Sequence, residues 1–85
     1  MIYYKDLKPE YNVIDIRDNF SYNEGHFINA KNIPMNSLLN DPGKYLNIND
    51  TYYIYCNRGI NSKRTCELLR LLNYKVINVI DGYQK

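Results

Sequence analysis

Residues 52–62 decide the fold, and they read YYIYCNRGINS. Aromatic and β-branched residues over Thr51–Cys56 predict a strand that ends on Cys56. A short loop with Gly59 at its middle follows, and Lys63–Asn73 is then expected to form a helix with Ser62 as its N-cap. This order places one sulfur at the floor of a cup of backbone N–H groups, at the positive end of a helix dipole. A thiolate is stabilised in such a place, so the sequence predicts that Cys56 is a reactive nucleophile.

The rest of the chain alternates between short strands and helices. The pattern predicts strands at Asn12–Ile16, Ala30–Ile33 and Val76–Ile80. A helical turn is expected at Ser21–His26, with Ser21 as its N-cap and Glu24 completing a capping box. A short helix is expected within Met35–Tyr45, and it should break at Asp41-Pro42-Gly43. Such alternation implies an α/β fold: one small domain over residues 1–85, with a mainly parallel central sheet and helices on both faces. Chemistry in these folds lies at the carboxyl ends of the strands, near Asp15 and Cys56.

Composition excludes several classes of function. The 85 residues suffice for one domain, and 45% hydrophobic and 24% charged residues are ordinary for a globular protein. The net charge of +2 is too small to indicate a nucleic-acid or membrane-surface partner. The N-terminus lacks the features of a signal peptide and no apolar run approaches the roughly 20 residues of a membrane span. We therefore expect a cytoplasmic protein with neither nucleic acid nor membrane as partner.

The two cysteines, Cys56 and Cys66, carry different expectations. They do not make a disulfide framework, they fit no zinc pattern, and the single histidine cannot complete one, so no metal or other cofactor is expected. Arg58, Lys63 and Arg64 add positive charge near Cys56, which lowers a thiol pKa and attracts anions. Cys66 lies on the predicted apolar stripe of the helix and is expected in the core. The other members of that stripe are Leu69, Leu72 and, at its edge, Leu68.

Two motifs resemble those of rhodanese domains. Asp15-Ile16-Arg17 followed by residues 22–34 (YNEGHFINAKNIP) is similar to the family pattern D-x-R…G-H-I-x-G-A-x-N-I-P. Residues 56–62 (CNRGINS) resemble the active-site loop C-x-x-G-x-R-S. The resemblance extends from about residue 12 to residue 83. It implies a thiosulfate sulfurtransferase-like enzyme or persulfide carrier in which Cys56 takes a sulfane sulfur from thiosulfate or a donor protein's persulfide. A thiophilic acceptor, either a small thiol or a protein, then receives the sulfur.

The same resemblance implies a substrate-binding loop and shows where this chain departs from the family. The implied binding residues are Asn57, Arg58, Gly59, Ile60, Asn61 and Ser62. Asn61 stands where many members have arginine, and Arg58 is the alternative source of that charge. Ser21 replaces an acid, so Arg17 is expected to pair with Glu24 or Asp18. Asn29 and Asp81 replace glycines and are expected to tolerate positive φ. After Gly82 the family's last helix is expected to be missing or minimal.

Two other classes of function remain open at this point. A cysteine phosphatase or arsenate reductase uses a similar cup, but it requires an arginine six positions after the cysteine, where this chain has Ser62. A non-catalytic binding or regulatory module on the same fold is the principal alternative, because the loop arginine and the long tail are absent. His26, Asp15 and Arg17 are expected to serve the structure rather than the chemistry.

Overall fold

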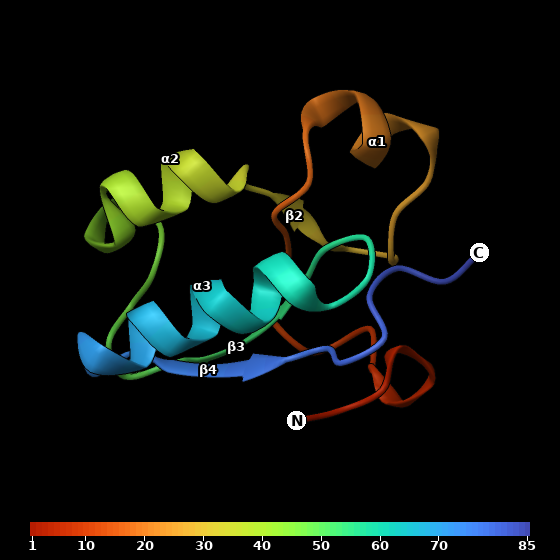
Figure 1. Cartoon of the computed structure of the whole chain (residues 1–85). Helices are drawn as coiled ribbons and strands as arrows, with labels where there is room; N and C mark the ends of the chain where they lie inside the picture. The colour runs from red at the N-terminus through yellow and green to blue at the C-terminus, as the bar shows by residue number, and fades with distance from the viewer.

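The computed structural model describes residues 1–85 and is built on a four-stranded sheet (Figure 1). The strands are β1 (Val13–Asp15), β2 (Lys31–Asn32), β3 (Thr51–Tyr55) and β4 (Lys75–Asn78), arranged in the order β2-β1-β3-β4. All three pairings are parallel. The predicted α/β class with a parallel sheet is therefore confirmed.

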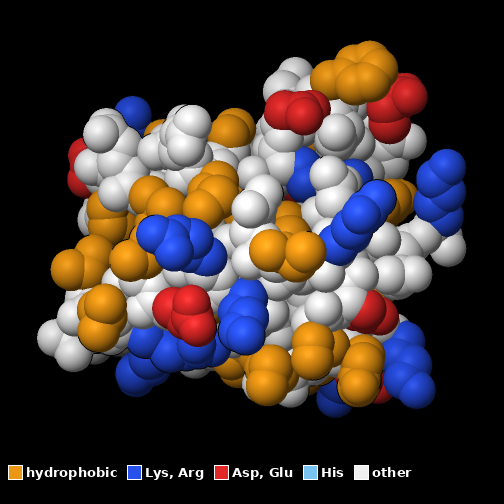
Figure 2. All heavy atoms as spheres, viewed as in Figure 1, with side chains coloured by type: hydrophobic (Ala, Val, Ile, Leu, Met, Phe, Trp, Pro, Cys, Tyr) orange, Lys and Arg blue, Asp and Glu red, His pale blue; other side chains and the backbone are white.

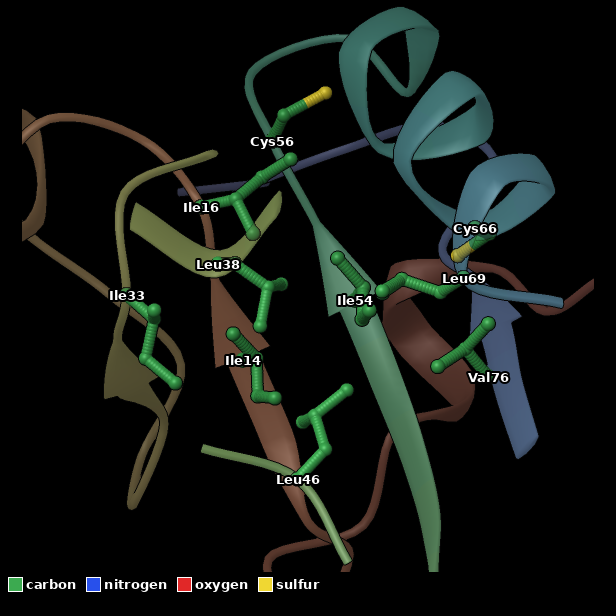
Figure 3. Packing of buried hydrophobic residues seen from close by; sticks show 10 residues of the cluster. All are labelled: Ile14, Ile16, Ile33, Leu38, Leu46, Ile54, Cys56, Cys66, Leu69 and Val76. Carbon is green, nitrogen blue, oxygen red and sulfur yellow. The ribbon is translucent and has the colours of Figure 1, made fainter. Parts of the chain in front are cut away.

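One face of the sheet is covered by the two helices α2 (Met35–Asn40) and α3 (Ile60–Leu71) (Figure 1). A short 3-10 helix, η2 (Pro42–Lys44), follows α2 at the predicted break. Buried side chains from α2, α3, β1, β3 and β4, and from the segments next to the strands, meet on this face (Figure 3). They are Ile14, Ile16, Ile33, Leu38, Leu46, Ile54, Cys56, Cys66, Leu69 and Val76. This cluster is the larger of the two cores, and it includes Cys56.

The opposite face carries a smaller, aromatic core. Successive strand residues point to opposite faces, so Val13 and Tyr55 lie here while Ile14 and Ile54 lie in the larger core. The 3-10 helix η1 (Tyr4–Asp6) and the helix α1 (Asn19–Glu24) flank this face, and Tyr4 and Tyr22 pack against its buried residues. Helices on both faces were predicted, and the second face is covered mainly by tyrosine rings and short helical turns.

The cap predicted for α1 is wrong. Asp18, not Ser21, is the N-cap, and its carboxylate accepts a hydrogen bond of 2.8 Å from the backbone N–H of Ser21. Asp caps helices as well as Ser does, and the helix begins at the next residue, which places Ser21 inside the first turn. Glu24 is the last residue of the helix, so no capping box forms.

The helix α3 begins earlier than predicted, and its buried stripe is different. Gly59 is its N-cap in the left-handed conformation (φ 86°), which lets the helix begin at Ile60 and places Ser62 within the first turn. The buried residues of α3 are Ser62, Thr65, Cys66 and Leu69. The core position of Cys66 is confirmed. Leu68 and Leu72 are exposed, contrary to the prediction. The helix ends at Leu71, so Leu72 is the C-cap and no longer follows the helical period.

The segments around β4 also differ in detail from the prediction. The strand ends at Asn78. Val79 forms an isolated parallel bridge with Ile2, and its N–H still donates to the Ile54 carbonyl at 3.0 Å. Asn29 has the expected positive φ of 66°, but the prediction for Asp81 is wrong, since the left-handed residue of that turn is Gly82 at 70°. Asp81 instead accepts a hydrogen bond of 2.8 Å from the backbone N–H of Tyr4. No helix in this fold has the length and apolar character needed to cross a membrane.

Candidate active site

Cys56 lies at the carboxyl edge of the sheet, directly after β3 and below the start of α3 (Figure 3). Asp15 of β1 pairs in register with Tyr55 of β3, so the residues that follow these two strands emerge side by side. Ile16 and Arg17 therefore lie beside Cys56 and its loop. The parallel topology thus brings two segments about forty residues apart in the sequence to one site.

Three polar groups surround the Cys56 sulfur. The backbone N–H of Gly59 donates to Sγ at 3.2 Å, and the backbone N–H of Ser62 donates at 3.3 Å. The Cys56 thiol donates to Ser62 Oγ at 3.4 Å. Once the thiol has ionised, the Ser62 hydroxyl can donate to the sulfur instead. The predicted cup of main-chain donors beneath the sulfur is present, and the Ser62 side chain adds to it.

The pKa values of the two cysteines move in opposite directions. Burial opposes ionisation of Cys56, but hydrogen bonds from the Ser62 hydroxyl and from the backbone N–H groups of Ser62, Arg58 and Gly59 outweigh it and lower the pKa below the usual thiol value. Burial raises the pKa of Cys66 to about 12. Cys56 is therefore the activated thiol. The lowering comes from hydrogen bonds, as the predicted cup of N–H groups implied, and the charges of Arg58, Lys63 and Arg64 are not among its leading causes.

A pocket of about 380 Å³ opens above the sulfur. Its lining residues come from the segments that follow β1 and β3 and from the first turn of α3, and they are Ile16, Arg17, Cys56, Asn57, Arg58, Ile60 and Asn61. Gly59 and Ser62, the other two predicted binding residues, are buried and contact the sulfur from below. Of the predicted loop residues, some therefore line the pocket and the others donate hydrogen bonds to the sulfur. Figure 2 shows Lys and Arg side chains interspersed with hydrophobic ones on the face that carries α3.

Two glycines allow the loop to lie directly on the chain that follows β4. A side chain at Gly59 would overlap the carbonyl of Ile80, and one at Gly82 would overlap the backbone of Asn57. Asn78 of β4 supports the loop from below, because its Nδ2 donates to the Gly59 carbonyl at 3.4 Å. The same carbonyl accepts the first helical bond, from Lys63 N. The Gly59 carbonyl, at the start of α3, is therefore held by two donors.

Arg17 is a pocket residue that the sequence argument assigned to structure alone. Its guanidinium forms an ion pair with Asp15 (2.7 Å) and donates to the Gly25 carbonyl at 2.7 Å. The partners predicted for it, Glu24 and Asp18, were wrong, because the fully buried carboxylate of Asp15 lies two residues away at the strand end. The predicted tie between strand and loop is confirmed. Its place at the pocket follows from its position two residues past the end of β1, beside the strand that leads to the cysteine.

His26 lies away from this pocket. Its ring stacks on Tyr22 with 3.7 Å between centroids, and Nδ1 is 2.8 Å from the Tyr22 carbonyl. The side chain is exposed and does not line the pocket of Cys56. The structural interpretation of His26 agrees with these contacts.

Known proteins share this fold and this sequence pattern. The family model of the rhodanese-like domain matches residues 3–85. A rhodanese-like domain protein from Staphylococcus aureus is 32% identical, with a TM-score of 0.78 over 91% of this chain and 74% of its own. A protein from Staphylococcus saprophyticus is 33% identical, with a TM-score of 0.79 over 85% of this chain and 71% of its own. A rhodanese-related protein from Thermoplasma volcanium is 32% identical, with a TM-score of 0.78 over 87% and 73% of the two chains.

A curated relative adds a comparison of length. The uncharacterized protein YqhL of Bacillus subtilis is 27% identical over 74 residues, which make up 86% of this chain and 58% of that relative. The chain therefore spans less than two thirds of that relative's length. The family match over residues 3–85, the parallel fold and the cysteine loop agree with one another. This chain belongs to the rhodanese-like domain family.

Proposed function

We propose that this domain is a sulfurtransferase or persulfide carrier that moves a sulfane sulfur through Cys56. The observation that carries the proposal is the set of N–H donors from Gly59 and Ser62 on the sulfur, at 3.2 and 3.3 Å. A thiolate needs this stabilisation in order to attack, and a persulfide anion needs it in order to persist. The proposed donor is thiosulfate or a protein persulfide, and the proposed acceptor is a small thiol or a protein thiol.

The transfer proceeds in two nucleophilic steps. The Cys56 thiolate attacks the outer sulfur of thiosulfate, a new S–S bond forms, and the bond to the sulfonate sulfur breaks. Sulfite leaves with that electron pair, and the enzyme holds Cys–S–S⁻. An acceptor nucleophile, such as cyanide, then attacks the terminal sulfur and releases the Cys56 thiolate. Electrons balance without an external oxidant, since thiosulfate supplies sulfur that is already oxidised relative to sulfide.

Two observations favour the alternative function, a non-catalytic binding module. The loop position that carries arginine in many rhodanese domains holds the neutral Asn61, and Cys56 is buried, with 5% of the residue exposed. A module of this kind would hold sulfur without passing it on. The test must therefore separate loading of the sulfur from its transfer.

Intact mass measurement provides that test. After incubation with thiosulfate, the protein is expected to gain the mass of one sulfur atom, and cyanide or a thiol is expected to remove it. The matched variants are Cys56→Ser, which should gain nothing, and Cys66→Ser, which should load like the unmodified chain because the Cys66 thiol is buried and un-ionised. Loading of Cys56→Ser would refute the assignment. Full loading without transfer to any acceptor would favour the binding module.

A further inference from the structure

The loop that carries Cys56 stands between two hollows. One is the pocket of about 380 Å³ above the sulfur. The other, of about 430 Å³, lies between the start of α3 and the segment after β4, with Lys63 and Ile80 among its lining residues. Arg58 and Ile60 line both hollows. A molecule that rests on these two side chains therefore reaches the sulfur on one side and the second hollow on the other.

Two isoleucines expose apolar surface at this place. Ile60, the first residue of α3, is 71% exposed, and Ile80 is 39% exposed. A single exposed apolar side chain is ordinary on a protein surface, but two that line one hollow beside a nucleophile are typical of an interaction site. Cyanide or an inorganic ion has no apolar surface to bury against them, whereas a peptide side chain has.

The charges around the two isoleucines have one sign. Arg58 and Lys63 are exposed, and neither takes part in an ion pair, since the one ion pair of the domain joins Arg17 to Asp15. No Asp or Glu side chain lines either hollow. An apolar centre flanked by unpaired cations is complementary to an apolar segment that carries carboxylates.

The backbone holds this surface in place. Gly59 packs so closely on the chain after β4 that a side chain there would overlap the Ile80 carbonyl, and Figure 1 shows that chain running beside the loop before α3. The Gly59 carbonyl accepts a hydrogen bond from Asn78 Nδ2 at 3.4 Å, and the Ile80 N–H donates to the Ile2 carbonyl at 2.8 Å. Ile60 and Ile80 thus stand on one framework, so a partner that binds them does not have to order the loop first.

We propose that this surface docks a segment of a protein sulfur acceptor, one that carries its cysteine between apolar and acidic residues. The docking surface consists of Arg58, Ile60, Lys63 and Ile80. The inference rests on the proposed function for the sulfur that is passed on, and it makes the acceptor a protein rather than a small thiol. The docked cysteine thiolate attacks the terminal sulfur of the Cys56 persulfide. A new S–S bond forms on the acceptor, the S–S bond on Cys56 breaks, and Cys56 leaves as the thiolate, so the electrons balance.

Activated cysteine peptides measure docking without any transfer of sulfane sulfur. The probe is the end-blocked peptide Glu-Leu-Cys-Leu-Glu, its cysteine joined to thionitrobenzoate as a disulfide, and it is compared with Lys-Leu-Cys-Leu-Lys and Glu-Ser-Cys-Ser-Glu. The Cys56 thiolate attacks the peptide sulfur and forms a disulfide with it. Thionitrobenzoate leaves with the electron pair of the broken bond, and its absorbance gives the rate. The ratio of rates for two peptides, in the Cys66→Ser background, cancels any change in the pKa of Cys56.

Lys63→Glu tests the charge of the docking surface. The parent protein should react faster with the Glu peptide than with the Lys peptide, and this ratio should fall by about fivefold or more in Lys63→Glu, because an attraction becomes a repulsion. Lys75→Glu makes the same change of charge at the start of β4, outside both hollows, and should alter the ratio by less than about twofold. A ratio near one in the parent protein, or equal responses of the two variants, would overturn the proposal.

Ile60→Ser tests the apolar part of the surface. The preference for the Leu peptide over the Ser peptide should fall by about threefold or more, because the leucines lose an apolar contact. Leu71→Ser is the matched control, since Leu71 is 79% exposed on the same helix and lines neither hollow, and it should leave the preference unchanged. A dimer in solution that dissociates in Ile60→Ser would assign the surface to a second copy of this chain and overturn the proposal.

Sulfur loading separates this proposal from the proposed function. If the domain takes up sulfur from thiosulfate while the peptide ratios do not respond to Lys63→Glu or Ile60→Ser, the docking surface is refuted and the sulfurtransferase stands. If no sulfur is loaded while the ratios shift as described, the surface docks a cysteine segment and the proposed function falls.

Discussion

The backbone N–H of Tyr83 donates a hydrogen bond of 2.8 Å to the carbonyl of Cys56. The segment after β4 is thereby attached to the residue that carries the nucleophile. The Tyr83 ring also lies over the guanidinium of Arg17, 4.3 Å from its central carbon. The last residues of the chain are therefore part of the candidate site, and the conformation of the turn that leads to them should matter for the stability of the loop.

Gly82→Ala should destabilise the domain markedly. Gly82 has φ 70°, and an added Cβ would overlap the Asn57 backbone next to Cys56. The left-handed conformation alone costs a residue with a side chain about 1–2 kcal/mol, and the overlap adds to it. The melting temperature should fall by roughly 10 °C, measured by circular dichroism. Gly43→Ala is the control: its Cβ would meet only the Tyr74 hydroxyl at an ordinary 3.5 Å. Equal losses in the two variants would contradict the close approach of the two segments.

The alkylation rate of Cys56 should reach half its maximum below the ordinary thiol pKa of about 8.5. Burial opposes this shift, and hydrogen bonds from Ser62, Arg58 and Gly59 overcome it. At pH values between the folded and the unfolded pKa of Cys56, the unfolded chain binds more protons than the folded one. The free energy of unfolding should therefore rise with pH across that interval, and the stabilisation from the Cys56 thiolate should be lost as pH falls through the folded pKa. Cys56→Ser should flatten this rise. A midpoint above 8.5 would contradict the activated thiol.

Ser62→Ala should raise the pKa of Cys56, because it removes the hydroxyl 3.4 Å from the sulfur and keeps the backbone N–H. The measurement is the pH profile of iodoacetamide alkylation in the Cys66→Ser background. Ser37→Ala on α2 is an exposed matched control and should leave the profile unchanged. A profile for Ser62→Ala that coincides with the unmodified one would show that the main-chain donors alone set the thiol pKa.

The strand that ends on Cys56 could be predicted because its signals are local: a run of aromatic and β-branched residues, then a glycine loop. The cap of α1 and the start of α3 could not, because Asp18 and Gly59 compete with nearby serines as caps and only the backbone path decides between them. The place of Arg17 at the pocket depends on the pairing of β1 with β3, a long-range contact that no local pattern encodes. Leu72 followed the helical period in the sequence, but the helix ends at Leu71.

Asn78 offers the sharpest test of how the loop is supported from the sheet. Its Nδ2 donates to the Gly59 carbonyl at 3.4 Å, while its Oδ1 is buried without a partner. Asn78→Ala removes one weak bond together with one unsatisfied acceptor, so these two effects partly cancel and the loss in the free energy of unfolding should be about 1 kcal/mol. Asn78→Asp replaces the donor with a buried charge that faces the Gly59 carbonyl, and the loss should reach about 3 kcal/mol or more.

Urea unfolding of the two variants, compared at pH 7, measures this difference. The Asp variant should recover stability as pH falls, because its side-chain pKa is raised by burial and protonation restores a donor for the Gly59 carbonyl. The Ala variant has no such group and should show no recovery. If the two variants were equally stable at pH 7, the amide of Asn78 would not hold the Gly59 carbonyl, which would then be held only by its helical bond from Lys63 N.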